Sequence, residues 1–115
     1  MPEPIGPDYH IHIKTITEPA LTADGSSAAF TLRWFEPVSL RPRSEVFVAD
    51  LAGGPPRQLT HESDSEFPAW SPDGHTVAFL RPDVHGRRQV WVMGAAGGEA
   101  NQITNEPLGV DGLAW

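Results

Sequence analysis

The sequence predicts an all-β fold, built from antiparallel four-stranded blades of an incomplete β-propeller, with about two blades and the start of a third. A strand–turn–strand pattern recurs along the chain, and its period of roughly 40–50 residues is typical of propeller blades. No segment shows the periodicity of a helix. The 11 glycines and 12 prolines among the 115 residues would interrupt most helices in any case.

The recurring pattern is clearest around the turn Ser71–Gly74. The aromatic strand Phe67–Trp70 leads into this turn, and the apolar strand Thr76–Arg81 follows it. Pro19–Gly25 repeats the order of these residues 49 positions upstream, and Leu113–Trp115 resembles the beginning of a third copy. Because the last copy is interrupted, we expect the chain to be a piece of a larger repeating protein.

The second half of each copy repeats with a shorter offset of 44 residues. Three segments of the first copy match three of the second: Val46–Val48 with Val90–Val92, Gly53–Gly54 with Gly97–Gly98, and Gln58–Thr60 with Gln102–Thr104. The two offsets differ because the connection between the second and third apolar runs is longer in the first copy, from Trp34 to Ser44, than in the second, from Pro82 to Arg88.

Each copy is expected to form four strands. In the second copy these are Phe67–Trp70, Thr76–Arg81, Gln89–Met93 and Asn101–Thr104. Between the first two strands, Pro72 presets φ at the second turn position, Asp73 suits the third, and Gly74 takes the left-handed position. The third strand is rich in β-branched and aromatic residues, and Gly97–Gly98 supplies the positive φ angles of the hairpin before the fourth.

These elements divide the chain into four predicted parts. Residues 1–18 form an irregular N-terminal segment and one strand, Tyr9–Lys14. Residues 19–66 form the first blade, residues 67–109 the second, and residues 110–115 the first strand of a truncated third blade. A single small β-sandwich with coincidental turns is the structural alternative. Two blades do not close a ring, so the chain by itself is expected to expose strand edges and to aggregate.

The composition restricts the classes of partner and compartment. The formal net charge is −7, from 8 basic and 15 acidic residues, which argues against nucleic acid and anionic membranes as partners. The absence of cysteine excludes disulfides and thiolate chemistry. No signal-peptide pattern and no apolar run of about 20 residues is present, so a cytoplasmic protein is expected. Four arginines from Arg33 to Arg57 and three from Arg81 to Arg88 are interpreted as solvated blade loops in preference to an anion site.

Two segments that contain histidine carry residue types found in functional sites. His10 and His12 lie two apart on an expected strand, a spacing that suits a metal if a third ligand converges. No such ligand is evident, so solvent-facing histidines are favoured. His61–Glu66 has the residue types of a hydrolytic triad, but triads are assembled from separate elements of a fold. We interpret it as an inter-blade loop, with an acidic contact to substrate or to a neighbouring domain as the alternative.

No other motif indicates catalysis or cofactor binding. The chain contains no Gly-x-Ser-x-Gly nucleophile elbow, phosphate-binding glycine loop or EF-hand pattern, and Gly94–Gly98 is interpreted as part of a hairpin. Trp70 and Trp115 occupy the same repeat position and are expected to pack between blades. Together with Trp34 and Trp91 they give no indication of a ligand cage. The sequence therefore predicts no catalytic, cofactor-binding or metal-binding residue in this chain.

The repeat resembles that of the TolB-like and prolyl oligopeptidase-like propellers. The resemblance rests on Ser71–Gly74 between Pro-x-Trp and Val-Ala-Phe, followed by Val-Trp-Val-Met, Gly-Gly and Gln-Ile-Thr. It covers roughly Asp8 to Trp115, and the first copy departs from it with Leu21–Ala23 where the second has Trp70–Pro72. Two flanking regions look like the acylaminoacyl-peptidase branch of the prolyl oligopeptidase family: Ile16–Gly25, and Ile103-Thr104 followed by Gly109-Val110 and Leu113–Trp115.

The resemblance implies an N-terminal propeller that caps a C-terminal α/β-hydrolase domain with a Ser-Asp-His triad and admits peptides but not folded proteins. None of the triad positions exists in this chain, so no catalytic residue carries over. The leading hypothesis is the N-terminal propeller portion of such a serine peptidase, whose partners are the hydrolase domain and peptide substrates. A non-catalytic TolB-like propeller that binds protein partners is the alternative, and a two-bladed protein that closes by oligomerising is the third.

Overall fold

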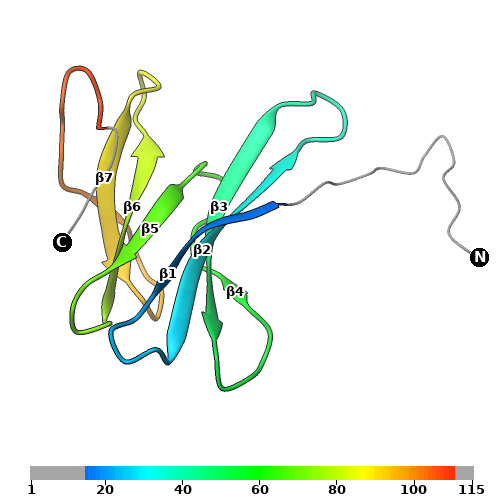
Figure 1. The fold of residues 1–115 in the computed structure, drawn as a ribbon. Helices are drawn as coiled ribbons and strands as arrows, with labels where there is room; N and C mark the ends of the chain where they lie inside the picture. The colour runs from blue at the N-terminus through cyan, green and yellow to red at the C-terminus, as the bar shows by residue number, and fades with distance from the viewer. Residues whose placement is uncertain (1–14, 111–115) are drawn as a thin grey trace, which may run out of the picture.

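The computed structural model describes residues 15–110, which form two four-stranded antiparallel sheets (Figure 1). The first sheet contains β1 (Thr15–Leu21), β2 (Ser27–Phe35), β3 (Pro42–Asp50) and β4 (Arg57–Gln58). The second contains β5 (Glu66–Trp70), β6 (Thr76–Pro82), β7 (Arg88–Gly94) and β8 (Asn101–Gln102). In both sheets neighbouring strands follow one another in sequence, and residues 15–110 contain no helix. The predicted all-β class with four-stranded antiparallel blades is confirmed.

The strand boundaries differ from the predicted ones by more than one residue at two points. β1 begins at Thr15, four residues before the expected start of the first blade, while the strand predicted at Tyr9–Lys14 and the third copy at Leu113–Trp115 lie outside the described residues. β8 ends at Gln102 and not at Thr104. The reason is that the hydroxyl of Thr104 accepts the hydrogen bond from the Val90 amide, at 2.9 Å, in place of a backbone carbonyl.

The extra residues of the first copy lengthen its central hairpin. The second and third strands have nine residues each in the first sheet and seven each in the second. Their pairing continues to Phe35 opposite Pro42, whereas the matching pairing in the second sheet ends at Pro82 opposite Arg88. Much of the predicted long connection is therefore strand, and the β2–β3 hairpin projects at the same end of the molecule as the β6–β7 hairpin (Figure 1).

The turn Ser71–Gly74 has the predicted geometry. The Gly74 amide donates to the Ser71 carbonyl at 2.9 Å, and Gly74 has a φ of 74°. The Asp73 carboxylate accepts from the Ser71 hydroxyl at 2.6 Å and from the His75 amide at 2.9 Å. Asp24 makes the matching contacts in the first sheet, so the turn is held by the same side-chain bonds in both copies.

The core lies between facing surfaces of the two sheets, where β5 lies against β1, β2 and β3. Ala29, Val46 and Val48 of the first sheet pack there with Val77, Phe79 and Met93 of the second. Removing such apolar side chains from water contributes on the order of 25 cal/mol per Å² of buried area. This shared core is what joins the two sheets.

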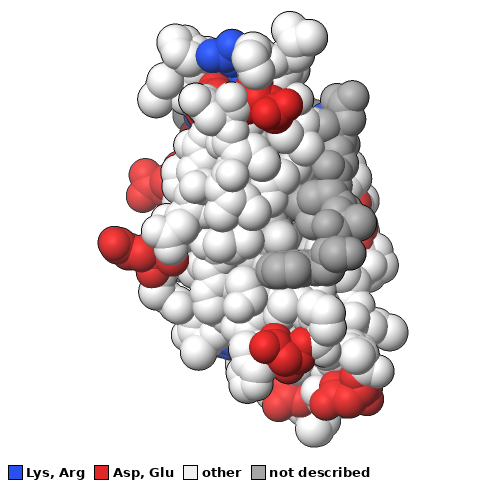
Figure 2. All heavy atoms as spheres, turned by 90° about the vertical axis from the view of Figure 1, so that its left-hand side faces the viewer, with Lys and Arg blue, Asp and Glu red and all other residues white. Residues whose placement is uncertain are grey.

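Each sheet also has a second apolar face. Ala78, Leu80 and Val90 form a separate buried cluster on the far face of the second sheet, with Val92 and Val110 against it. On the far face of the first sheet, the rings of Phe30 and Phe47 stack with their centroids 5.9 Å apart. The side of the molecule that carries β7 has an uncharged middle, with charged residues at its two ends and along one edge (Figure 2). Sheets with two apolar faces are those that pack against a neighbour on both sides, as propeller blades do.

Candidate functional site

The same hydrogen-bonding pair joins the third strand of each sheet to the segment after its fourth strand. In the first sheet, the Thr60 hydroxyl donates to Glu45 Oε1 at 2.6 Å. In the second, the Thr104 hydroxyl donates to Gln89 Oε1 at 2.7 Å. Both threonines belong to the repeated Gln-x-Thr motif, so this motif serves to close the outer edge of each blade.

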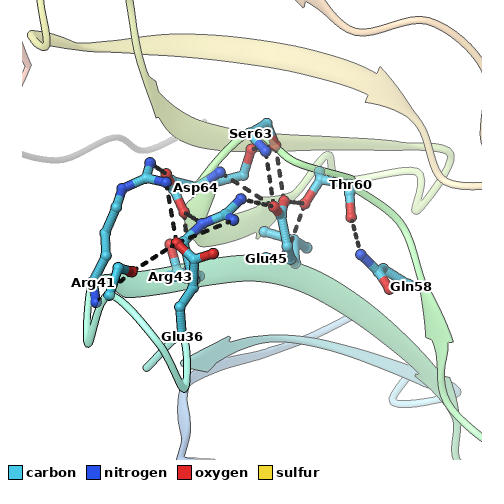
Figure 3. Close-up of polar contacts among 12 residues, drawn as sticks. Glu36, Arg41, Arg43, Glu45, Gln58, Thr60, Ser63 and Asp64 are labelled. Atoms are coloured by element: carbon cyan, nitrogen blue, oxygen red, sulfur yellow. Dashed lines mark hydrogen bonds and ion pairs between the residues drawn. The ribbon is translucent and has the colours of Figure 1, made fainter. Parts of the chain in front are cut away.

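Glu45 also holds the loop between β4 and β5 (Figure 3). Its side chain is only 1% exposed. Its Oε2 accepts from the amides of Ser63 at 2.8 Å and Asp64 at 3.3 Å, and its Oε1 accepts from the Ser63 hydroxyl at 2.8 Å. A buried carboxylate is costly unless donors surround it. With Thr60 included, four donors do so, and they fix the loop relative to β3.

Asp64 ties the same loop to the β2–β3 hairpin (Figure 3). Its Oδ2 accepts from Arg41 Nη2 at 2.9 Å, and its Oδ1 accepts from Arg43 Nε at 2.7 Å. Glu36 lies 3.4 Å from Arg41 and 3.9 Å from Arg43. The hydrogen bond to Asp64 raises the pKa of Arg43 above its ordinary value, against the opposing effect of burial. The charges here are mutually satisfied, which is the arrangement of a structural brace.

The first strand of each sheet bulges at the same repeat position. Glu18 in β1 has a φ of 49° and Phe67 in β5 has a φ of 53°, and the pairing with the next strand shifts register at both places. Residues other than glycine rarely adopt this left-handed conformation. Bulges bend a strand and change the direction of its side chains, and here they direct two matching positions toward one cluster.

Arg33 is the centre of that cluster and connects the two sheets. Its Nη2 donates to Glu18 Oε2 at 2.7 Å and its Nη1 donates to Glu66 Oε1 at 2.8 Å, while Arg88 Nη1 donates to Glu66 Oε2 at 2.7 Å. Both guanidinium groups lie over the Phe67 ring, each 5.7 Å from its centroid. Burial acts to raise the pKa of Glu18, but hydrogen bonds led by that from Arg33 outweigh it and leave the pKa below its ordinary value.

Residues from both clusters line a hollow of about 450 Å³ between the two sheets, which we call the hairpin hollow. Its lining residues include Arg33, Trp34, Phe35, Arg43, Glu66 and Pro82. Apolar walls with a few fixed polar groups are typical of sites that bind organic ligands or polypeptide segments. No described histidine lines this hollow, and its lining serine, Ser44, is buried. The hairpin hollow therefore offers a binding surface without a nucleophile–base pair.

The segment His61–Glu66 joins β4 to β5, as its interpretation as an inter-blade loop requires. Ser63, Asp64 and Glu66 are engaged in the structural contacts described above, and Ser63 shares a hydrogen bond with Ser65 at 2.8 Å. His61 is exposed, and no hydrogen bond joins it to either serine among the described residues. The segment therefore does not have the geometry of a triad.

The tryptophans make different contacts from one another. Trp70 Nε1 donates to the Ala20 carbonyl at 2.9 Å, which joins the second sheet to the first as a packing residue between blades should. Trp34 lies under Arg43 and Trp91 under Arg81. Trp115 lies outside the described residues.

The described residues, 15–110, contain neither a metal-binding cluster nor a membrane-spanning helix. No group of three or more histidine, cysteine or carboxylate side chains there could hold a metal ion. No helix in this part of the chain is long and apolar enough to cross a membrane. His10 and His12 lie outside the described residues.

Sequence reasoning missed Glu45, Gln89 and Arg33. A signal for the first two was present, because Glu45 and Gln89 stand 44 residues apart, like the motifs around them, and each directly precedes the apolar run of its strand. No such signal existed for Arg33, whose partners Glu18 and Glu66 come from separate strands that only the packing of the two sheets brings together.

Two curated relatives resemble this chain in sequence, although no protein-family profile matches it. The uncharacterized peptidase YuxL of Bacillus subtilis is 32% identical over 104 residues, which is 90% of this chain and 16% of that protein. Dipeptidyl-peptidase 5 of Porphyromonas gingivalis is 31% identical over 79 residues, which is 68% of this chain and 12% of that protein. The chain thus spans less than a fifth of the length of either relative.

Solved structures share its fold. The β-propeller domain of the trilobed protease of Pyrococcus furiosus matches 84% of this chain and 28% of that one, with a TM-score of 0.67 and 18% identity. Acylaminoacyl peptidase of Pyrococcus horikoshii matches 80% and 14%, with a TM-score of 0.66 and 21% identity. A TolB-type protein of Agrobacterium tumefaciens matches 84% and 32%, with a TM-score of 0.64 and 24% identity.

At these identities the structures show a shared fold alone, whereas the peptidase sequences show the kind of protein in which the repeat occurs. Residues 15–110 form two four-stranded blades with the fold of a β-propeller, and the chain is related in sequence to the peptidases YuxL and dipeptidyl-peptidase 5.

Proposed function

We propose that this chain is the propeller portion of an acylaminoacyl-peptidase-like serine peptidase, and that it limits which peptides reach a C-terminal α/β-hydrolase domain. The observation that carries the proposal is the sequence similarity to YuxL, which extends over 90% of this chain but only 16% of that peptidase. The aligned region contains no nucleophile–base pair among its described residues, so the catalytic residues belong to the remainder of the protein.

A gating role agrees with the way the two blades are joined. Arg33 and Glu66 connect the sheets at 2.8 Å, and Glu45 fixes the loop that passes between them. A wall that excludes large substrates has to keep its blades together, because an opening between them would admit unfolded polypeptide. The paired charges and the shared core supply that cohesion.

The direct test compares the complete product of the gene with the 115-residue chain. We expect the complete protein to cleave an acyl-aminoacyl or dipeptidyl chromogenic substrate and this chain, purified alone, to have no activity. Measurable cleavage by the isolated chain would contradict the proposal.

A TolB-like propeller that binds protein partners is the second candidate. The fold shared with the Agrobacterium protein and the apolar walls of the hairpin hollow favour it. The coding sequence beyond Trp115 separates the two. About four or more further blades followed by a Gly-x-Ser-x-Gly elbow support the peptidase, and a stop after the last blade supports the binding module.

A further inference from the structure

Arg81 is an arginine within a blade-to-blade surface and not on a solvated loop. It lies on β6, and its guanidinium carbon is 4.6 Å from the centroid of the Trp91 ring and 5.1 Å from that of Phe79. Its Nε donates to the Ser65 hydroxyl at 3.1 Å. The matching position of the first blade, 49 residues upstream, is Leu32. The fold therefore accepts an aliphatic side chain at this position, so folding alone does not explain why the second blade has an arginine there.

The guanidinium of Arg81 has no carboxylate partner within residues 15–110. Five of the other described arginines form ion pairs, and Arg57 donates to the Ala95 carbonyl. Within residues 15–110, the hydrogen bond of Arg81 uses Nε, and neither Nη group has an acceptor there. Burial lowers the pKa of Arg81 below its ordinary value, and the charge of Glu45 offsets this only in part. A half-buried cation without a partner is costly, and an anion would relieve that cost.

Arg81 opens onto a second hollow, of about 640 Å³, which we call the junction hollow. Its lining includes His61, Arg81, His85, Trp91, Gln102 and Asn105. Most of these side chains can donate a hydrogen bond.

Two carboxylates also line the junction hollow, but neither pairs with Arg81. Asp83 accepts from the amides of His85 and Arg87 and from the side chain of Gln89, so its oxygens are already engaged. Glu62 is exposed. The buried Nε1 of Trp91 has no acceptor among the described residues. This end of the hollow is therefore rich in donors and short of acceptors.

We propose that the junction hollow binds a carboxylate of a peptide, with the guanidinium of Arg81 as its counter-ion. The carboxylate is either the C-terminal group or an acidic side chain, since both present the same pair of oxygens to a guanidinium. The site rests on the contacts of Arg81, and only the choice of a peptide as the carrier rests on the proposed function.

The test measures binding to the complete product of the gene by calorimetry, without turnover of the probe. Ac-Ala-Ala-Ala-OH carries only the C-terminal carboxylate, Ac-Ala-Asp-Ala-NH₂ only the side-chain carboxylate, and Ac-Ala-Ala-Ala-NH₂ neither. We expect at least one of the first two to bind about tenfold or more tightly than the third, because hydrogen bonds between charged groups are stronger than those between neutral ones.

The matched variant is Arg81→Leu, which places in the second blade the residue that the first blade already has. It should abolish the preference for a carboxylate, and Arg81→Lys should keep part of it. An unchanged preference in Arg81→Leu, equal affinities for all three probes, or equal binding of free acetate would overturn the proposal. If Arg81→Leu shows no thermal unfolding transition and so does not fold, Arg81→Lys and the comparison of the three probes with the wild type still test the proposal.

Failure of this site and failure of the proposed function give different results. Hydrolysis of a neutral chromogenic amide by the complete protein, together with no carboxylate preference, contradicts the junction hollow alone. Carboxylate binding at Arg81 without any hydrolysis contradicts the peptidase alone.

Discussion

Glu45 and Gln89 occupy the same position in the two blades, and each accepts a hydrogen bond from the threonine of its own blade, at 2.6 Å and 2.7 Å. The second terminal atom differs between the two side chains: that of Glu45 accepts hydrogen bonds, and that of Gln89 donates them. Glu45 Oε2 accepts from the backbone amides of residues 63 and 64. Gln89 Nε2 donates to Asp83 Oδ2 at 3.1 Å and to the Glu106 carbonyl at 2.8 Å. Each side chain is therefore matched to the loop beside it.

Glu45→Gln should destabilise the first blade although the second blade has glutamine there. The variant keeps the bond to Thr60 but turns an NH₂ group toward the Ser63 amide, which leaves two donors face to face. We expect a loss of about 1–3 kcal/mol, seen as a lower thermal midpoint and faster proteolysis of the loop 61–65. Glu99→Gln, the same change at an exposed residue, serves as the control. Equal behaviour of the two variants would show that Glu45 does not hold the loop.

Glu66→Gln should weaken the contact between the blades. Glu66 forms ion pairs with Arg33 at 2.8 Å and with Arg88 at 2.7 Å. The variant therefore leaves two guanidinium groups beside each other without the carboxylate that they share. We expect a loss of about 1–3 kcal/mol, part of which disappears at high salt because charge interactions are screened. Thermal midpoints at low and high salt measure it. Glu62→Gln, an exposed site in the same loop, should match the wild type, and equal midpoints for all three proteins would contradict the role given to Glu66.

The indole nitrogens of Trp70 and Trp91 give a matched pair of substitutions. Trp70→Phe removes the donor to the Ala20 carbonyl and should cost about 1 kcal/mol more than Trp91→Phe. Trp91 Nε1 has no described acceptor, so its loss removes no hydrogen bond. Thermal denaturation of the two variants compares them. A greater cost for Trp91→Phe would mean that the Ala20 contact contributes little to joining the sheets.

The turn at Asp24 should make folding sensitive to acid. Hydrogen bonds from the Ser26 hydroxyl and amide and from the Thr22 hydroxyl lower the pKa of Asp24 from 3.8 to about 2. Since the folded-state pKa lies below the unfolded one, this stabilisation is full above about pH 4. It is lost as the pH falls toward 2. Titration by NMR should find the low pKa, and Asp24→Asn should remove this part of the pH dependence. A pKa near 3.8 would contradict the turn geometry.

The 115-residue chain should associate when made alone. Within the described residues, the apolar cluster of Ala78, Leu80 and Val90 on the far face of the second sheet has no further sheet packed against it. The half-buried stack of Phe30 and Phe47 lies on a face with no described sheet against it. Light scattering after size exclusion should show heterogeneous association. A monomer that unfolds cooperatively would contradict this, and a discrete symmetric oligomer would support the two-bladed oligomer instead.

The strands and turns could be predicted from the sequence because local chemistry encodes them. Gly74 and Asp73 specify a turn by backbone preference and side-chain hydrogen bonding, and the spacing of Gln58 and Gln102 gives the period of the repeat. The cation–carboxylate pairing of Arg33 could not be predicted in this way. It depends on which faces of the two sheets meet, and on a bulge at Glu18 that lacks the glycine usual at a positive φ.

The long connection predicted from Trp34 to Ser44 was partly wrong for a related reason. The β2–β3 pairing continues to Phe35 opposite Pro42, so both ends of the predicted connection are strand. No local sequence signal marks where the strands give way to the turn. The length of a hairpin depends on its pairing across strands as well as on local preference. The junction hollow likewise arises only when Arg81, on β6, comes beside Ser65 of the inter-blade loop.

The size selectivity of the complete protein tests the gating account most directly. The quantity is the ratio of kcat/KM for a short acylated peptide to that for an unfolded polypeptide of the same cleavage sequence. The account predicts a ratio that strongly favours the short peptide in the wild type and falls in a variant with Arg33→Ala and Glu66→Ala, whose blades are less firmly joined. A ratio near one in the wild type would contradict it.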